Sequence, residues 1–154
     1  MIKNADLKDI KNISRLLFEL YKDEEKYDNT LISEWANTDE CAAWIKEDIE
    51  NNCVLVATEN DEVVGFLIGE AIEENNISHK RGDLIFIYSN DSKTYDELFE
   101  EFKKWCIGVD IKDITIVSSF ENKKEQANYK KYGFKEFETV MIMNIEEGEI
   151  NENI

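Results

Sequence analysis

The sequence contains no proline, one histidine and six glycines among its 154 residues. Without proline to mark turns, element boundaries must be inferred from helix caps, glycines and hydrophobic periodicity. The single histidine, His79, lies in a polar, loop-like stretch, so neither a histidine metal site nor a Cys–His catalytic pair is expected. The three cysteines form no CxxC pair, and we expect them to be reduced and mostly buried thiols.

Long apolar runs are also missing. No segment approaches the roughly 20 apolar residues that a helix needs to span a bilayer. The N-terminal stretch is charged and lacks the apolar core of a signal peptide. We therefore expect no membrane association and a cytoplasmic location. Apolar residues make up 42% of the chain and charged residues 34%, which is typical of one globular domain.

Basic residues are scarce relative to acidic ones. The chain has 18 Lys and Arg against 35 Asp and Glu, a formal net charge of −17. Such a chain repels a phosphate backbone, so nucleic-acid binding is not expected. The same field attracts a cationic small molecule such as a polyamine or an aminosugar, although the charge can also serve solubility alone. The acidic residues are spread along the chain and define no single patch.

The N-terminal third is predicted to form a short strand and two amphipathic helices. Asp6 is placed as an N-cap with Asp9 three positions later, and apolar residues then recur at helical spacing to about Glu25. The period is lost until Thr38 or Asp39, which caps the second helix. The expected elements are a strand at residues 2–5, a helix at 6–25, a loop at 26–37 and a helix from 38 or 39.

The middle of the chain is predicted to form three strands and a long helix. Apolar residues occupy both parities of the first two strands, which indicates a sheet covered on both faces. Gly65 and Gly69 inside the second strand indicate a bulge or a close backbone approach. The expected elements are strands at 53–58, 63–72 and 84–88, a turn at 59–62 and a helix at 92–109.

The C-terminal part is predicted to contain two more strands and a short helix. Asn122 and Glu125 are placed as a capping box, and Gly133 suits a left-handed C-cap. The expected elements are a strand at 114–118, a helix at 122–132, a strand at 137–145 and an acidic, flexible tail at 146–154. The order β-α-α-β-β-β-α-β-α-β predicts one α/β (α+β) domain over residues 1–145, with a mixed sheet and helices on both faces.

The segment NKKEQANYKKYGFKEF, residues 122–137, resembles a strand-to-helix segment of the GNAT N-acetyltransferases, N-x-x-A-x-x-x-Y-x-K-x-G-F. The matching residues are Asn122, Tyr129, Lys131, Gly133 and Phe134, with Glu125 in place of the usual small residue. The hairpin VLVATENDEVVGFLIG is similar to the family's central hairpin, and the element order agrees from Ile2 to Ile145. The resemblance implies a mostly antiparallel central sheet and transfer of an acetyl group from acetyl-CoA to an amine.

The resemblance also implies where acetyl-CoA binds. In this family two strands splay apart to admit the pantetheine arm, which here places the backbone of Ile87 and Tyr88 beside it. A glycine-rich loop, R/Q-x-x-G-x-G/A, then aims backbone N–H groups at the pyrophosphate. Asn122 often lies near the cofactor in relatives, although its capping role explains its presence equally well.

The pyrophosphate loop departs from the family pattern. Either Lys93 and Tyr95 replace the two glycines or the loop is shortened, and Asp91 adds a negative charge where a phosphate is expected. Ser92, Lys93 and Thr94 can still offer hydroxyls, an ammonium group and a helix N-terminus to an anion.

Candidate catalytic and substrate residues follow from the resemblance, each with a structural alternative. Tyr129 matches the position that protonates the leaving thiolate, although a helix tyrosine packed on the sheet is also common. Asp83 and Glu70 are candidates for the base, although strand-end acids are usually solvated and water can relay the proton. Tyr27 and Trp35 can line an acceptor pocket or simply anchor the core.

Two functions remain open from the sequence. The first is an N-acetyltransferase that acts on a primary amine of a cationic small molecule. The second is a degenerate domain of the same fold that has lost acetyl-CoA and serves as a binding module. Self-association as a homodimer through the last predicted strand is compatible with both.

Overall fold

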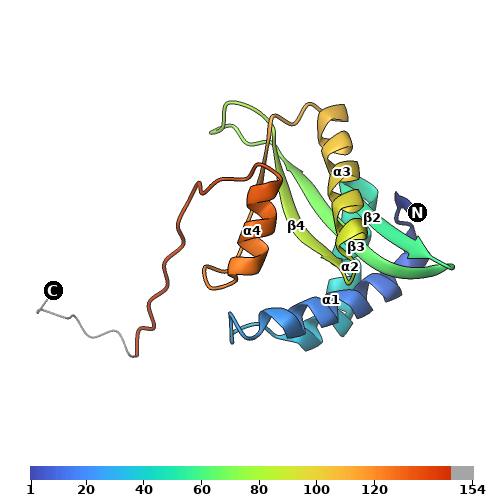
Figure 1. The fold of residues 1–154 in the computed structure, drawn as a ribbon, viewed down its shortest axis with the longest axis horizontal. Coiled ribbons are helices and arrows are strands. Elements are labelled where there is room, and N and C mark those ends of the chain that lie inside the picture. The colour runs from blue at the N-terminus through green and yellow to red at the C-terminus, as the bar shows by residue number, and fades with distance from the viewer. Residues whose placement is uncertain (147–154) are drawn as a thin grey trace, which may run out of the picture. The chain divides into compact units, whose positions relative to one another are not determined.

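The structure is a computed structural model, and it describes residues 1–146. The chain divides into two compact units, Met1–Glu121 and Asn122–Ile154. The first unit contains a five-stranded sheet and three α-helices, and the second contains one helix within its described residues (Figure 1). None of the helices in the described part of the chain combines the length and apolar character needed to cross a membrane.

The two N-terminal helices begin at caps that the sequence predicted. After β1 (Ile2–Asn4), Asp6 and Asp9 form a capping box at a short 3-10 helix, which leads into α1 (Ile10–Glu24). The Asp6 backbone N–H donates to Asp9 Oδ2 at 2.9 Å. Thr38 caps α2 (Asp39–Asn51), because its Oγ1 accepts from the Cys41 backbone N–H at 3.2 Å. The predicted loop between the helices contains a 3-10 turn at Ser33–Asn37.

The sheet has the order β1-β2-β3-β4-β5, in which the first three pairings are antiparallel and the last is parallel. The other strands are β2 (Cys53–Glu59), β3 (Glu62–Ile72), β4 (Arg81–Ser89) and β5 (Asp113–Ile116). The predicted hairpin joins β2 and β3, with Asn60 and Asp61 in the left-handed region at φ 51° and 64°. Asparagine and aspartate tolerate this conformation, which matches the twist of a tight hairpin.

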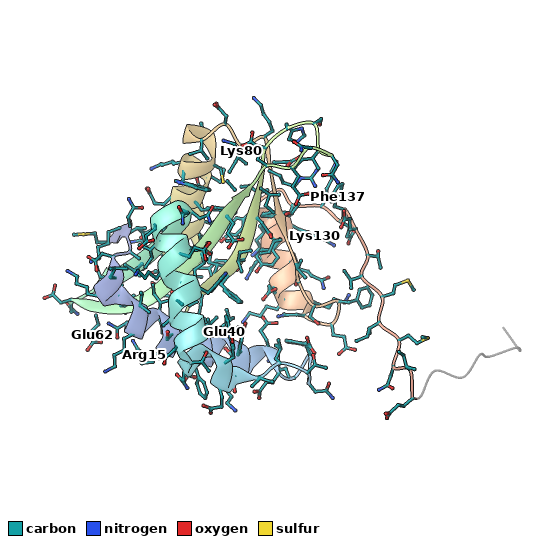
Figure 2. All side chains as sticks on the ribbon, turned by 180° about the vertical axis from the view of Figure 1, so that it is seen from behind. Arg15, Glu40, Glu62, Lys80, Lys130 and Phe137 are labelled. Carbon is teal, nitrogen blue, oxygen red and sulfur yellow. The ribbon has the colours of Figure 1, made fainter. Side chains whose placement is uncertain are left out.

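Helices cover both faces of the sheet, as predicted. In Figure 1, α3 (Ser92–Gly108) lies in front of the strands, and in Figure 2, seen from behind, α2 lies in front. Val54 and Val56 of β2 belong to the core shared with α1 and α2. Cys53, Leu55 and Ala57, which alternate with them, are also buried and point to the opposite face, where α3 packs on β2. Because side chains alternate between the two faces of β2, this strand contributes to the apolar core on each side of the sheet.

The two glycines of β3 mark close approaches, as the sequence indicated. A Cβ atom at Gly69 would lie 2.2 Å from Phe102 Cε1, so the α3 ring packs directly on the strand backbone. A Cβ atom at Gly65 would lie 2.8 Å from the Tyr88 carbonyl oxygen on β4. The three cysteines are free and buried, as predicted.

In the second unit, α4 (Lys123–Lys131) begins at Asn122 and ends before Gly133, whose φ is +100°. Both boundaries confirm the predicted caps. The predicted strand at 137–145 is wrong, because those residues join no sheet within the described part of the chain. Val140 and Ile142 are 86% and 92% exposed. The physical reason is that strand propensity is local, whereas a strand exists only when a neighbour pairs with it. Residues 147–154 of the predicted tail lie outside the described residues. That residues 1–145 form a single domain stays a prediction.

Candidate functional site

The candidate site begins where β4 and β5 separate. Their parallel pairing runs only from Arg81 opposite Asp113 to Leu84 opposite Ile116. β4 then continues to Ser89, paired with β3 alone. Over residues 85–89, the edge of β4 that faced β5 has no strand partner within the described residues. The strands therefore part beside Ile87, as the resemblance implied, and leave backbone N–H and C=O groups open to an extended ligand.

A β-bulge lies at the same point. Phe86 pairs with Ile68 and Leu84 pairs with Gly69, so Ile85 is an extra residue on β4. Bulges bend a strand and re-aim its side chains, and they are over-represented beside active sites. Here the bulge lies where the pairing of β4 with β5 ends. The predicted residues Ile87 and Tyr88 lie just beyond it, and the Tyr88 hydroxyl donates to Asn90 Oδ1 at 3.1 Å. Burial, followed by the charges of Asp23 and Glu19, raises the pKa of Tyr88.

An aromatic cluster covers β4 from the side of α1 and α2. Phe86 packs edge-on against Tyr21 and Trp44, with ring centroids 5.7 and 5.9 Å apart. Trp35 joins both, at 6.3 Å from Tyr21 and 6.1 Å from Trp44. The structure thus brings Trp35, predicted as a substrate residue, into the aromatic cluster that covers β4. Tyr27, predicted with it, instead lies under the ammonium group of its neighbour Lys26, 5.1 Å from the ring centroid.

The two acids predicted as base candidates lie directly opposite each other. Glu70 of β3 pairs with Asp83 of β4, one residue before the pairing of β4 with β5 ends. Burial, followed by the charge of Glu70, raises the pKa of Asp83, while the Thr115 hydroxyl, 3.5 Å from Asp83 Oδ1, opposes the change. The sequence could not show this pairing, since it depends on the register of the two strands.

A third acid, Asp48 at the end of α2, lies against Glu70 and is only 3% exposed. Its Oδ1 accepts from Asn52 Nδ2 at 2.9 Å, and Asn52 Oδ1 accepts from the Ala71 backbone N–H at 3.1 Å. Burial, then a hydrogen bond with Asp48 and the charge of Asp48, raises the pKa of Glu70 to about 7. Asp48 was missed in the sequence, although Cys41, Ile45 and Asp48 share the buried stripe of α2.

The N-terminus of α3 is already capped by a carboxylate. Asp91 Oδ1 accepts from the Lys93 backbone N–H at 3.0 Å, and its Oδ2 accepts from Thr94 Oγ1 at 3.0 Å. The Tyr95 backbone N–H donates to the Asp91 carbonyl oxygen. Ser92 and Lys93 are exposed, and Lys93 Nζ lies 4.0 Å from Glu97 Oε1. The open edge of β4 fits a pantetheine arm, but the helix N-terminus does not fit a pyrophosphate while Asp91 holds it.

An open groove of about 620 Å³ runs along α3 from this N-terminus. Its lining is Ile2, Ser92, Lys93, Asp96, Glu97, Glu100, Glu101 and Lys104. Four carboxylates against two lysines make it repel phosphate groups. We therefore place the candidate site at the β4 edge and not in the groove. No group of three or more His, Cys, Asp or Glu side chains within residues 1–146 is arranged to hold a metal ion.

The remaining predicted residues, Asn122 and Tyr129, lie in the second unit. Asn122 caps α4, since its Oδ1 accepts from the Glu125 backbone N–H at 3.1 Å and its Nδ2 donates to Glu125 Oε2 at 3.3 Å. Tyr129 is 7% exposed, and its ring packs edge-on against Phe134 at 5.8 Å. Their roles in catalysis and cofactor binding stay predictions.

No protein-family model and no curated protein matches the sequence. Solved structures do match. A tetramutant of the BH1408 protein of Bacillus halodurans has a TM-score of 0.81 at 13% identity, over 94% of this chain and 99% of that one. A predicted acetyltransferase of Clostridium acetobutylicum, solved with acetyl-CoA, has a TM-score of 0.75 at 20% identity, over 96% and 97%.

The aminoglycoside N-acetyltransferase AAC(6')-Iy, in complex with CoA, has a TM-score of 0.69 at 14% identity, over 94% and 93% of the two chains. At these identities the likeness concerns the fold. It agrees with the observed order of helices and strands. The chain has the fold of the GNAT N-acetyltransferases.

Proposed function

We propose that this protein is an N-acetyltransferase that moves an acetyl group from acetyl-CoA to a primary amine of a cationic small molecule. The observation that carries the proposal is the split between β4 and β5, which leaves the edge of residues 85–89 open beside two facing acids. Two of the solved structures with this fold hold acetyl-CoA or CoA, which supports the choice of co-substrate.

The open edge of β4 suits the pantetheine arm. Pantetheine contains amide groups, and an unpaired strand edge offers the alternating donors and acceptors that such amides match. We assign this role to the backbone of Ile87 and Tyr88. At the other end of the ligand, the exposed ammonium group of Lys93 is the cation available to a phosphate group in the first turn of α3.

The acids at the split suit the proton transfers of the reaction. An ammonium group must lose one proton before its nitrogen attacks the thioester carbonyl, and the nitrogen loses a second as the C–N bond forms. The C–S bond breaks with its electron pair on sulfur, and the thiolate takes up one proton. Glu70 and Asp83 have raised pKa values, which make their carboxylates stronger bases than ordinary ones. Tyr129 stays the predicted proton donor to sulfur.

The surroundings of the acids suit a cationic acceptor. The net charge of −17 draws cations toward the protein, and Glu70 and Asp83 place two of the acids at the site itself. Aromatic rings attract cations through their faces, and Trp35, Trp44 and Phe86 lie on the same side of the sheet. A polyamine or an aminosugar has the charge that this lining would select.

A second candidate function is a binding module of this fold that does not use acetyl-CoA. Asp91 favours it, because its carboxylate already accepts the hydrogen bonds that a pyrophosphate would take at α3. The absence of glycine from residues 90–95 favours it as well, because side chains keep the backbone away from a phosphate group.

Thermal melting with and without acetyl-CoA separates the two functions, with a simple salt at matched ionic strength as control. Ligand at a hundred times its dissociation constant adds about 2.7 kcal/mol to the free energy of unfolding, a shift on the order of 5–10 °C for this chain length. Such a shift, followed by CoA release on addition of polyamines or aminosugars, supports the transferase. No shift at millimolar acetyl-CoA refutes it and leaves the binding module.

A further inference from the structure

The side chain of Asp48 presents an unusual arrangement for a buried acid. Its residue is 3% exposed, and Oδ1 has a donor in Asn52. Oδ2 is fully buried, and no N–H or O–H group within the described residues donates to it. The carboxyl of Glu70 lies beside the Asp48 side chain. Buried polar atoms are almost always paired, so an orphaned carboxylate oxygen requires an explanation.

A single proton provides that explanation. Two ionised carboxylates in contact repel each other, and neither can donate a hydrogen bond. When one proton stays on Glu70, its O–H donates to Asp48 Oδ2, so the orphaned oxygen gains a partner and one of the two charges disappears. Asn52 stabilises the remaining charge, because it donates to the other oxygen of Asp48.

We propose that Asp48 is a positioning residue for Glu70: the two carboxyl groups share one proton, and Asp48 holds Glu70 at the split between β4 and β5. The sharing of the proton is inferred from the burial of Asp48, its unpaired Oδ2 and its contact with Glu70. The catalytic consequence rests on the proposed function, in which Glu70 takes a proton from the acceptor amine as the C–N bond forms and later releases it to water.

The placement of the pair fits this role. Asp48 is anchored by Asn52, which also binds the backbone of β3 at Ala71. Glu70 lies between this anchored group and Asp83, and Asp83 is one residue from the last pairing of β4 with β5. Asp48 is thus closed off from solvent, while Glu70 is only partly buried and lies at the candidate site.

Two acids face Glu70 from neighbouring elements. Asp48 faces it from α2 and Asp83 from β4, and both are acids. Asn52, which precedes β2, is uncharged. Thr115 of β5 lies behind Asp83 and opposes only the change at Asp83. Burial, then the hydrogen bond with Asp48 and the charge of Asp48, raise the Glu70 pKa to about 7, near the value at which a carboxylate is an effective base at neutral pH.

The test is a carbon-detected NMR titration of the Glu70 carboxyl in the full chain, comparing wild type with Asp48→Asn. The introduced asparagine keeps the shape of the side chain and an oxygen for the bond from Asn52, and its amide can donate to an ionised Glu70. We expect the Glu70 pKa to fall below about 7 in this variant while staying above 4.5, because burial, the largest cause of the raised pKa, remains. Glu47→Gln, an exposed neighbour on α2 with the same change in charge, should leave it in place. An ordinary Glu70 pKa in wild type overturns the proposal, and so does a Glu70 pKa in Asp48→Asn equal to that of wild type.

A second variant keeps the test valid if Asp48→Asn does not fold. In Glu70→Gln, the new amide still donates to Asp48 Oδ2 but cannot titrate. The wild type should lose stability as Glu70 ionises, so the melting temperature of the variant should rise relative to that of wild type from pH 5 to pH 8. Parallel plots of melting temperature against pH would overturn the proposal. Neither readout needs activity, so a failure of acetyl transfer leaves the proton-sharing result standing. If transfer does occur, the acid limb of its pH–rate profile should move to lower pH in Asp48→Asn.

Discussion

The carboxylate of Asp91 is the contact that decides whether α3 can hold an anion, and Asp91→Asn tests it. Asparagine caps a helix about as well as aspartate, so the free energy of unfolding should change by only a few tenths of a kcal/mol. The change removes one negative charge from the first turn of α3, where Asp91 contacts Lys93 and Thr94. At about 4 Å in a wet site, one charge pair is worth about 1 kcal/mol. We therefore expect acetyl-CoA to bind about fivefold more tightly.

The assay is isothermal titration calorimetry with acetyl-CoA at low and high salt. Asp110→Asn is the matched control, because it removes the same charge just beyond the far end of α3. That helix has 17 residues and spans about 25 Å, well beyond the screening length. The gain in Asp91→Asn should shrink in high salt. Equal dissociation constants for wild type and both variants would show that the pyrophosphate does not bind at α3, and the reasoning on this loop would fail.

Other changes test the packing, the acid pair and the second unit. Gly69→Ala should lower the free energy of unfolding in urea by about 1–3 kcal/mol, because the new Cβ would meet the Phe102 ring. Gly108→Ala is the control and should not destabilise, because a Cβ there has nothing within 4 Å. Equal stabilities of the two variants would contradict the packing at Gly69. The Glu70 pKa is raised above 4.5, so the free energy of unfolding of wild type should fall as pH rises toward 7, by about 1–2 kcal/mol after solvent screening. A difference in free energy of unfolding between wild type and Glu70→Gln that does not change with pH would contradict this. Ile142 is 92% exposed, so Ile142→Lys should reduce self-association in light scattering; a monomeric wild type would contradict that expectation.

Caps and turns were predictable because they depend on neighbours in the chain. Thr38, Asn122 and Gly133 end or begin helices where the sequence indicated, and each acts on groups within a few residues. Asp91 was identified from its charge, but its role as the cap of α3 was not. The split strands beside Ile87 followed from the family resemblance, and the register of β4 and β5 shows them.

Features that depend on distant partners were predicted poorly. Residues 137–145 have the composition of a strand, yet they pair with no strand within the described residues, because pairing requires an edge that the local sequence does not specify. Tyr27 and Trp35 lie in the same loop, but only Trp35 meets the aromatic cluster on β4. Which loop residue turns inward depends on the helices around it.

The sequence by itself determined the class of fold and the boundaries of most elements, because periodicity and capping are local. It also determined that a carboxylate, and no glycine, stands in the loop before α3. Only the tertiary structure brought Asp48 of α2 against Glu70 of β3 and placed Asp83 opposite. These three acids are far apart in the chain, and burial changes their chemistry only when packing excludes water and makes two carboxyl groups compete for one proton.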